Sequence, residues 1–184
     1  MTLIPLLGRH QPDDPIAWYR REIITCGGFL ADVAQLSERL PDRRYVLNLC
    51  EDRYHFLVGF AAALIRRQIS LFPPGRASKM LEQMRKEHSD VYCILDQNEP
   101  SADIESLRYE RNADSGDIRD MPFVSDDTIA ALVFTSGTTG RPQPHPKTWG
   151  SLVSVAMRTA TRLALGEEQP ASIVATVPPQ HMYG

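Results

Sequence analysis

Residues 129–144 read IAALVFTSGTTGRPQP, and this stretch decides the fold. The apolar run from Ile129 to Phe134 is typical of a buried strand, and it leads directly into residues 135–140, here called the small-residue loop. Glycine at positions 137 and 140 permits positive φ, and the hydroxyls and backbone N–H groups of such a loop can turn toward one anion. A strand followed by a loop of this composition predicts a phosphate site.

The common nucleotide-binding fingerprints do not fit this loop. Gly137 is followed five residues later by Pro142 rather than by Gly-Lys-Ser/Thr, and the chain contains no G-x-G-x-x-G. A flexible Ser/Thr/Gly linker is the alternative, but such linkers rarely stand between a buried strand and a helical segment. The helical signal after the loop therefore favours the phosphate site.

The stretch TSGTTGRP at 135–142 resembles the signature of the adenylate-forming enzymes, which include acyl- and aryl-CoA synthetases, luciferases and the adenylation domains of peptide synthetases. The last residues, PPQHMYG at 178–184, resemble the next motif of the same family, at the expected distance downstream. Two motifs in the right order make the resemblance specific. A looser likeness from Phe29 to Pro73 extends it over most of the chain.

The resemblance implies an activity: family members make an acyl-adenylate from a carboxylic acid and Mg-ATP, and pass the acyl group to a thiol such as coenzyme A or phosphopantetheine. It also implies that the small-residue loop wraps the β- and γ-phosphates of ATP, or pyrophosphate. The expected phosphate contacts are Thr135, Ser136, Gly137, Thr138, Thr139, Gly140, Gln143 and Lys147. The residues expected beside the carboxylic acid substrate are His181, Tyr183 and Gly184.

The motifs that follow in the family hold the adenine, ribose and magnesium contacts and the catalytic lysine. The resemblance ends at Gly184, before those motifs, so no catalytic and no metal-binding residue is expected here. We therefore expect one partial N-terminal AMP-binding domain over residues 1–184, with the C-terminal domain absent, and no catalysis by this portion alone.

Three positions depart from the family pattern. The family usually reads Pro-Lys-Gly where this chain has Pro142, Gln143 and Pro144, so a cation is missing beside the loop. Gln143 can donate hydrogen bonds but cannot neutralise charge. Either Lys147 or Arg141 supplies the positive charge, or phosphate affinity is weakened. Trp149 stands where the family often has histidine.

Alternating strand and helix patterns predict an α/β fold: a mostly parallel sheet with crossover helices, as in the opening portion of the large N-terminal domain of an adenylate-forming enzyme. Helices are expected over 29–40, 54–67, 77–88 and 148–165, and strands over 45–50, 69–72, 91–96, 129–134 and 171–177. Residues 97–127 are polar and poor in periodicity, which indicates a long surface connection with a short strand near 107–110.

The composition excludes several classes of protein. A net charge of −3 with scattered basic residues argues against nucleic-acid binding. Cys26, Cys50 and Cys93 lack C-x-x-C spacing, which indicates buried free thiols. The apolar run from Phe56 to Ile65 is too short to cross a membrane, and no signal peptide is recognised, so a cytoplasmic location is expected. An incomplete parallel sheet would expose an edge, which predicts self-association.

Two functions of different class remain open. The chain is either part of an ATP-dependent acid-activating ligase of the acyl-CoA synthetase type, or a non-catalytic nucleotide-binding or protein-interaction module derived from that family. A Tyr-Gly-x-Thr-Glu, an Arg-x-x-Gly-Asp and a late Gly-Lys further along the reading frame would favour the first.

Overall fold

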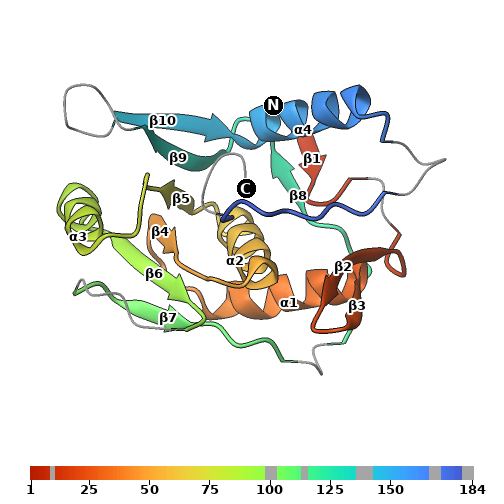
Figure 1. The fold of residues 1–184 in the computed structure, drawn as a ribbon, viewed down its shortest axis with the longest axis horizontal. Helices are drawn as coiled ribbons and strands as arrows, with labels where there is room; N and C mark the ends of the chain where they lie inside the picture. Colours follow the sequence, from red (N-terminus) through yellow and green to blue (C-terminus); the bar gives the residue numbers. More distant parts are fainter. Residues whose placement is uncertain (9–10, 98–102, 113–115, 136–142, 166–170, 180–184) are drawn as a thin grey trace.

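A six-stranded sheet forms the centre of the molecule (Figure 1). The structure is a computed structural model and describes residues 1–8, 11–97, 103–112, 116–135, 143–165 and 171–179. The strands of the sheet are β4 (Tyr45–Asn48), β5 (Ile69–Phe72), β6 (Val91–Leu95), β7 (Ser106–Arg108), β9 (Ile129–Thr135) and β10 (Gln143–Thr148). Their order is β10-β9-β5-β4-β6-β7, and every neighbouring pair is parallel except the antiparallel hairpin of β9 and β10. The predicted α/β class is confirmed.

The described helices are α1 (Cys26–Arg39), α2 (Arg53–Ile65), α3 (Ser78–Glu87) and α4 (Trp149–Arg162). Side-chain oxygens cap three of them, because Thr25, Asp52 and Thr148 each accept a backbone N–H from the first turn that follows. All four helices were predicted within a few residues. The first begins at Cys26 rather than near Phe29 because Thr25 is the cap.

Two apolar layers enclose the sheet: α1 and α2 pack on one face, and α3 packs on the other (Figure 1). Successive residues of a strand point to opposite faces, so Val46 joins the cluster of α1 and α2 while Leu47 joins Leu81 and Met84 of α3. Every residue of β6 is buried, as expected for a strand covered on both faces. The chain crosses from β4 to β5 on one side of β4, and then from β5 to β6 on the other side. The switch point of the topology therefore lies at the carboxyl ends of β4 and β6.

The N-terminal strands were not predicted. They are β1 (Leu3–Pro5), β2 (Pro15–Tyr19) and β3 (Glu22–Thr25). The first pairs with β8 (Phe123–Ser125), and the other two form a hairpin whose turn places Arg20 and Arg21 at φ values of 46° and 73°. The prediction of a long connection over 97–127 was therefore partly wrong: its described parts contain β7, close to the predicted short strand, and β8.

Two other predictions were incomplete or wrong. No strand was predicted between the small-residue loop and the helix expected over 148–165, but residues 143–148 form β10. This edge strand tolerates Pro144 and Pro146 because one side of an edge strand needs no N–H donors. Residues 171–177 were predicted as a strand, yet the described stretch 171–179 contains none. Ile173 and Val174 are 78% and 87% exposed there, so the apolar side chains that suggested a strand have no sheet surface to pack on.

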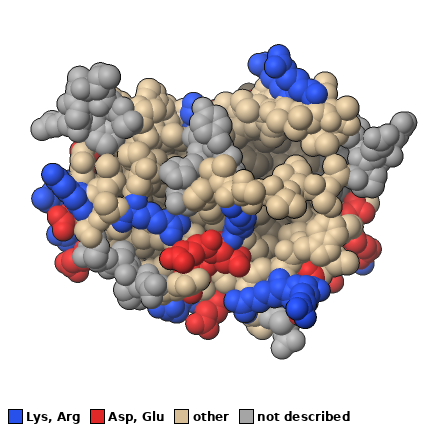
Figure 2. Space-filling model, in the orientation of Figure 1, with Lys and Arg blue, Asp and Glu red and all other residues tan. Residues whose placement is uncertain are grey.

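No helix in the described part of the chain is long and apolar enough to cross a membrane. The three cysteines are buried free thiols, as predicted. Figure 2 shows acidic and basic side chains side by side over one face of the molecule, as the near-neutral charge suggests.

Candidate functional site

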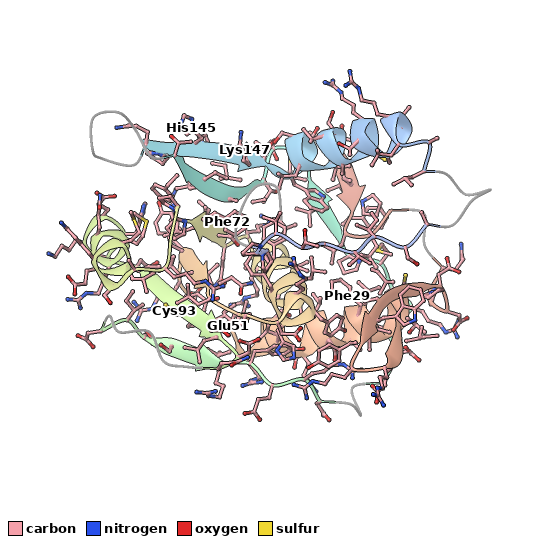
Figure 3. All side chains as sticks on the ribbon, in the orientation of Figure 1. Phe29, Glu51, Phe72, Cys93, His145 and Lys147 are labelled. Carbon is pink, nitrogen blue, oxygen red and sulfur yellow. The ribbon has the colours of Figure 1, made fainter. Side chains whose placement is uncertain are left out.

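The β9–β10 hairpin holds the stems of the small-residue loop. Thr135 ends β9 and pairs with Gln143, which begins β10. Farther from the loop, Val133 pairs with His145 and Ala131 with Lys147. Because side chains alternate along a strand, Gln143, His145 and Lys147 share one face of β10. Figure 3 shows Lys147 nearer to α4 than His145 is.

The structure therefore brings three of the predicted phosphate contacts, Thr135, Gln143 and Lys147, to one hairpin. The remaining predicted contacts lie outside the described residues: Ser136, Gly137, Thr138, Thr139, Gly140, His181, Tyr183 and Gly184. Among the residues with described positions, no three His, Cys, Asp or Glu side chains gather as a metal site.

His145 lies between Gln143 and Lys147 on this face of β10. Its side chain is exposed, but its Nε2 lies 3.3 Å from Oγ1 of Thr135, the first hydroxyl of the small-residue loop. His145 and Thr135 are diagonal neighbours across the hairpin, a separation that a long side chain can span. The pairing of β10 with β9, which the sequence did not predict, creates this contact.

The far end of the hairpin is fixed to α4 and to the turn before β9. The backbone N–H of Trp149 donates to the carbonyl of Thr128 at 2.8 Å, and that of Gly150 donates to the carbonyl of Asp126 at 2.9 Å. A Cβ on Gly150 would lie 2.9 Å from the same carbonyl, so only glycine allows the two backbones to come this close. The loop is thus carried by two anchored strands.

A second polar group, formed by Asp96, His55 and Tyr19, lies at the switch point. Nδ1 of His55 is 3.0 Å from Oδ2 of Asp96, and Nε2 of His55 is 2.9 Å from the hydroxyl of Tyr19. Asp96 also accepts the backbone N–H groups of Glu51 and Asp52, at 2.9 and 3.0 Å. Its carboxylate therefore occupies the end of α2 where an anion could otherwise bind.

Hydrogen bonding decides the charge of Asp96. Burial raises the pKa of this carboxyl, whose side chain is only 3% exposed, but the N–H donors of Glu51 and Asp52 and the bond from His55 outweigh burial and hold the pKa below its ordinary value. A carboxylate that is ionised across the physiological range accepts from Nδ1–H of His55, and in a neutral imidazole with this tautomer Nε2 accepts from the Tyr19 hydroxyl. The sequence signal for this group was an Asp directly after a buried strand, but its partners are distant in the chain.

Another charge pair, between Arg111 and the buried Asp32, fixes the residues that follow β7. Arg111 Nε donates to Oδ2 of Asp32 at 2.9 Å, and the Tyr54 hydroxyl donates to the same oxygen. Burial and the hydrogen bond to Asp32 raise the pKa of the Tyr54 hydroxyl, so it stays protonated. These contacts join α1, α2 and the residues after β7, which makes a structural role the direct reading.

Two cavities are lined in part by residues from the first turn of α2. One, of about 320 Å³, is lined by Glu51, Arg53, Arg76, Thr176, Pro178 and Pro179. Arg53 Nη1 donates to the carbonyl of Val177 at 2.5 Å, so the start of α2 holds the stretch that leads to the predicted substrate residues. The other, of about 480 Å³, is lined by Tyr19, Arg20, Glu22, His55, Asp96, Tyr109, Glu110 and Arg111.

The fold and the hairpin define an α/β domain of the kind found in adenylate-forming enzymes. The o-succinylbenzoate CoA synthetase of Bacillus subtilis, solved with ATP and magnesium ion, superposes with a TM-score of 0.70 at 16% identity, covering 93% of this chain and 49% of that one. MatB of Rhodopseudomonas palustris, solved without ligand, gives a TM-score of 0.62 at 15% identity, covering 82% of this chain and 34% of that one. At these identities the likeness concerns the fold alone.

Sequence comparison gives the family. Residues 34–184 match the AMP-binding enzyme family, and the chain belongs to it. The 2-succinylbenzoate–CoA ligase of Bacillus velezensis is 32% identical over 138 residues, which cover 72% of this chain and 26% of that protein. The chain thus spans about a quarter of the length of this curated relative.

Proposed function

We propose that this chain supplies the ATP-phosphate-binding part of an acid-activating ligase of the acyl- or aryl-CoA synthetase type. The β9–β10 hairpin carries the proposal, because it anchors a hydroxyl- and glycine-rich segment at the carboxyl end of a parallel strand in a chain of the AMP-binding family. Relatives support it: the Bacillus subtilis synthetase has been solved with ATP and magnesium ion, and the Bacillus velezensis protein is named a CoA ligase. The complete reaction would consume a carboxylic acid and Mg-ATP and transfer the acyl group to coenzyme A or a phosphopantetheine thiol.

The residues of this chain would act by positioning. Thr135 and the small-residue loop would donate hydrogen bonds to phosphate oxygens, each charge-assisted bond contributing about 1.5 to 3 kcal/mol. Lys147 and Gln143, on one face of β10, would add a cation and an amide donor. Pro178 and Pro179 line the 320 Å³ cavity. His181 follows them in the sequence and would help to orient the substrate carboxylate.

We further propose that the 184-residue chain alone makes no acyl-adenylate. The magnesium, ribose and lysine contacts that lower the barrier in this family belong to motifs that this sequence does not contain. Carboxylate-dependent exchange of labelled pyrophosphate into ATP measures this, with a panel of aliphatic and aromatic acids. An exchange rate above the protein-free blank would contradict the proposal.

Gln143 gives the direct test of phosphate binding. It is exposed at the start of β10, so Gln143→Lys places the family's usual cation opposite Thr135. The added charge should tighten pyrophosphate binding several-fold, since one such pair at a partly exposed site contributes on the order of 1 kcal/mol. Gly137→Val should weaken binding, because a β-branched side chain excludes positive φ and crowds the anion.

Titration calorimetry with pyrophosphate and with ATP compares these variants with the parent chain. Gln11→Lys, at an exposed site near the N-terminus, adds the same net charge elsewhere and should change nothing. Equal affinities for the parent, Gln143→Lys and Gly137→Val would show that the loop does not bind phosphate.

The alternative, a non-catalytic module, is favoured by one observation: Gln143 and Pro144 replace the lysine and glycine of the family motif. Such a module would bind nucleotide or a protein partner without chemistry. Joining residues 1–184 to the remainder of a related ligase separates the two functions, because only a catalytic origin predicts pyrophosphate exchange by the joined protein.

A further inference from the structure

The imidazole of His145 lies against the first hydroxyl of the small-residue loop. Its Nε2 is 3.3 Å from Oγ1 of Thr135, and the two residues are diagonal neighbours on one face of the hairpin. Gln143, the next residue toward the loop on this face, is the position where the family motif has lysine. A group that can become cationic is therefore placed about 7 Å along the strand from the missing charge.

We propose that His145 is a positioning residue that replaces the charge missing at Gln143, so that phosphate binding at this hairpin depends on pH. The inference rests on the proposed function and names a regulation of the same site. It concerns the parts of β9 and β10 that carry Thr135, His145 and Lys147.

The Thr135 hydroxyl gives the proposal its chemistry. When Nε2 carries no proton, it accepts the hydrogen of that hydroxyl, and Thr135 has then no proton to donate to a phosphate oxygen. When the imidazole is protonated, Nε2–H donates to Oγ1, and the hydroxyl hydrogen is free to turn toward phosphate. Protonation thus adds a positive charge and releases a donor in one step, and both changes favour an anion.

Few charged side chains face His145 from the described elements packed against it. On β10 the charged neighbour on the same face is Lys147, and the facing residues of β9, Ala131, Val133 and Thr135, carry no charge. On α4, which contacts β10, the first ionisable side chain is Arg158, beyond two turns of helix. Imidazole is the side chain that ordinarily changes charge between pH 5 and 8, whereas a lysine keeps its charge there.

The experiment measures the affinity of the 184-residue chain for inorganic pyrophosphate, without divalent metal, at steps from pH 5.5 to 8.5. Pyrophosphate itself titrates in this range, so the informative quantity is the ratio between proteins at each pH. His145→Gln keeps a hydrogen-bonding amide beside Thr135 but cannot titrate. His145→Arg carries a permanent charge, and Lys147→Gln removes a neighbouring charge that stays constant over this range.

The parent chain should bind about three- to tenfold more tightly than His145→Gln at pH 5.5, and the two should converge by pH 8. His145→Arg should keep the tighter binding up to pH 8, and Lys147→Gln should weaken binding by a constant factor. Identical pH profiles for the parent and His145→Gln, or a difference between them that is constant with pH, would overturn the inference but leave the proposed function standing. Absence of pyrophosphate binding by the parent at every pH would overturn both.

Discussion

At the scale of single residues, Asp96 is the side chain whose charge contributes most clearly to stability. It accepts two backbone N–H groups and the Nδ1–H of His55 while its side chain is 3% exposed. Its pKa lies below the ordinary value in the folded chain, so the stabilisation is complete above the unfolded pKa near 4 and is lost as pH falls through the folded pKa.

We predict that Asp96→Asn lowers the free energy of unfolding by about 2 kcal/mol at pH 7, because an amide supplies one acceptor where a carboxylate supplies two. The difference from the parent should be smaller at pH 3, because this pH lies below the unfolded pKa near 4, where the stabilisation by Asp96 declines. Urea unfolding at both pH values measures it. Asp103→Asn, at a fully exposed carboxylate, is the control and should have little effect at either pH.

Arg21 carries local backbone strain. Its φ of 73° in the β2–β3 turn lies in the left-handed region, which costs a non-glycine residue about 1 kcal/mol or more. We predict that Arg21→Gly raises the melting temperature by a few degrees, since about 1 kcal/mol is regained. Arg21→Ala removes the same charge but keeps the Cβ, so a similar rise in that variant would attribute the effect to charge instead.

At the scale of elements, the central strands and the four helices could be predicted because each has a local signal. Strand β6 is an apolar run, and α2 begins at an Asp cap and contains a long apolar stretch. The N-terminal strands have no such signal, since Leu3 pairs with Ser125 and that contact is invisible to a local pattern. For residues 171–177 the local pattern predicted a strand that does not form. Their apolar composition resembles a strand, but no described residues pair with them.

The candidate site divides in the same way. Thr135, Gln143 and Lys147 could be named from a motif that is contiguous in the sequence. The bond between His145 and Thr135 could not, because two prolines hid the strand that creates it. The bond between His55 and Asp96 joins residues 41 positions apart, so it required the parallel pairing of β4 with β6 and the loops that follow them.

Pro144 and Pro146 also protect β10, an edge of the sheet. Neither has an N–H to offer to another strand, and prolines on an edge discourage pairing between molecules. We predict that replacing both prolines by threonine increases association at high protein concentration. Light scattering and the β-sheet signal in circular dichroism would both rise. Replacing Ser106 of β7, a strand at the opposite edge, by threonine should leave association unchanged.

At the scale of the whole molecule, α4 exposes apolar side chains to solvent. None of its residues is buried, and Val155 and Met157 are 63% and 66% exposed. Leu163 just beyond it is 63% exposed, and Ile173 is 78% exposed. Exposed apolar side chains favour self-association, which the sequence analysis predicted from an exposed sheet edge.

We propose that the chain self-associates at high concentration, and that Val155→Lys combined with Met157→Lys reduces the association. Sedimentation velocity over a concentration series measures the effect. Substitution of Thr161 and Thr159, two exposed polar residues of the same helix, by lysine controls for charge. A parent chain that stays monomeric throughout the series would rule the proposal out.

The carboxylate of Asp96 affects where a phosphate group could bind on this domain. Parallel α/β sheets commonly offer a helix end at their switch point as a landing place for phosphate. Here Asp96 accepts the N–H groups of Glu51 and Asp52, the cap Asp52 accepts those of Tyr54 and His55, and the negative charge of the two carboxylates repels a triphosphate. Under the proposed function, these two carboxylates would disfavour ATP at the β4–β6 end of the sheet, so that its phosphates would bind at the β9–β10 end instead.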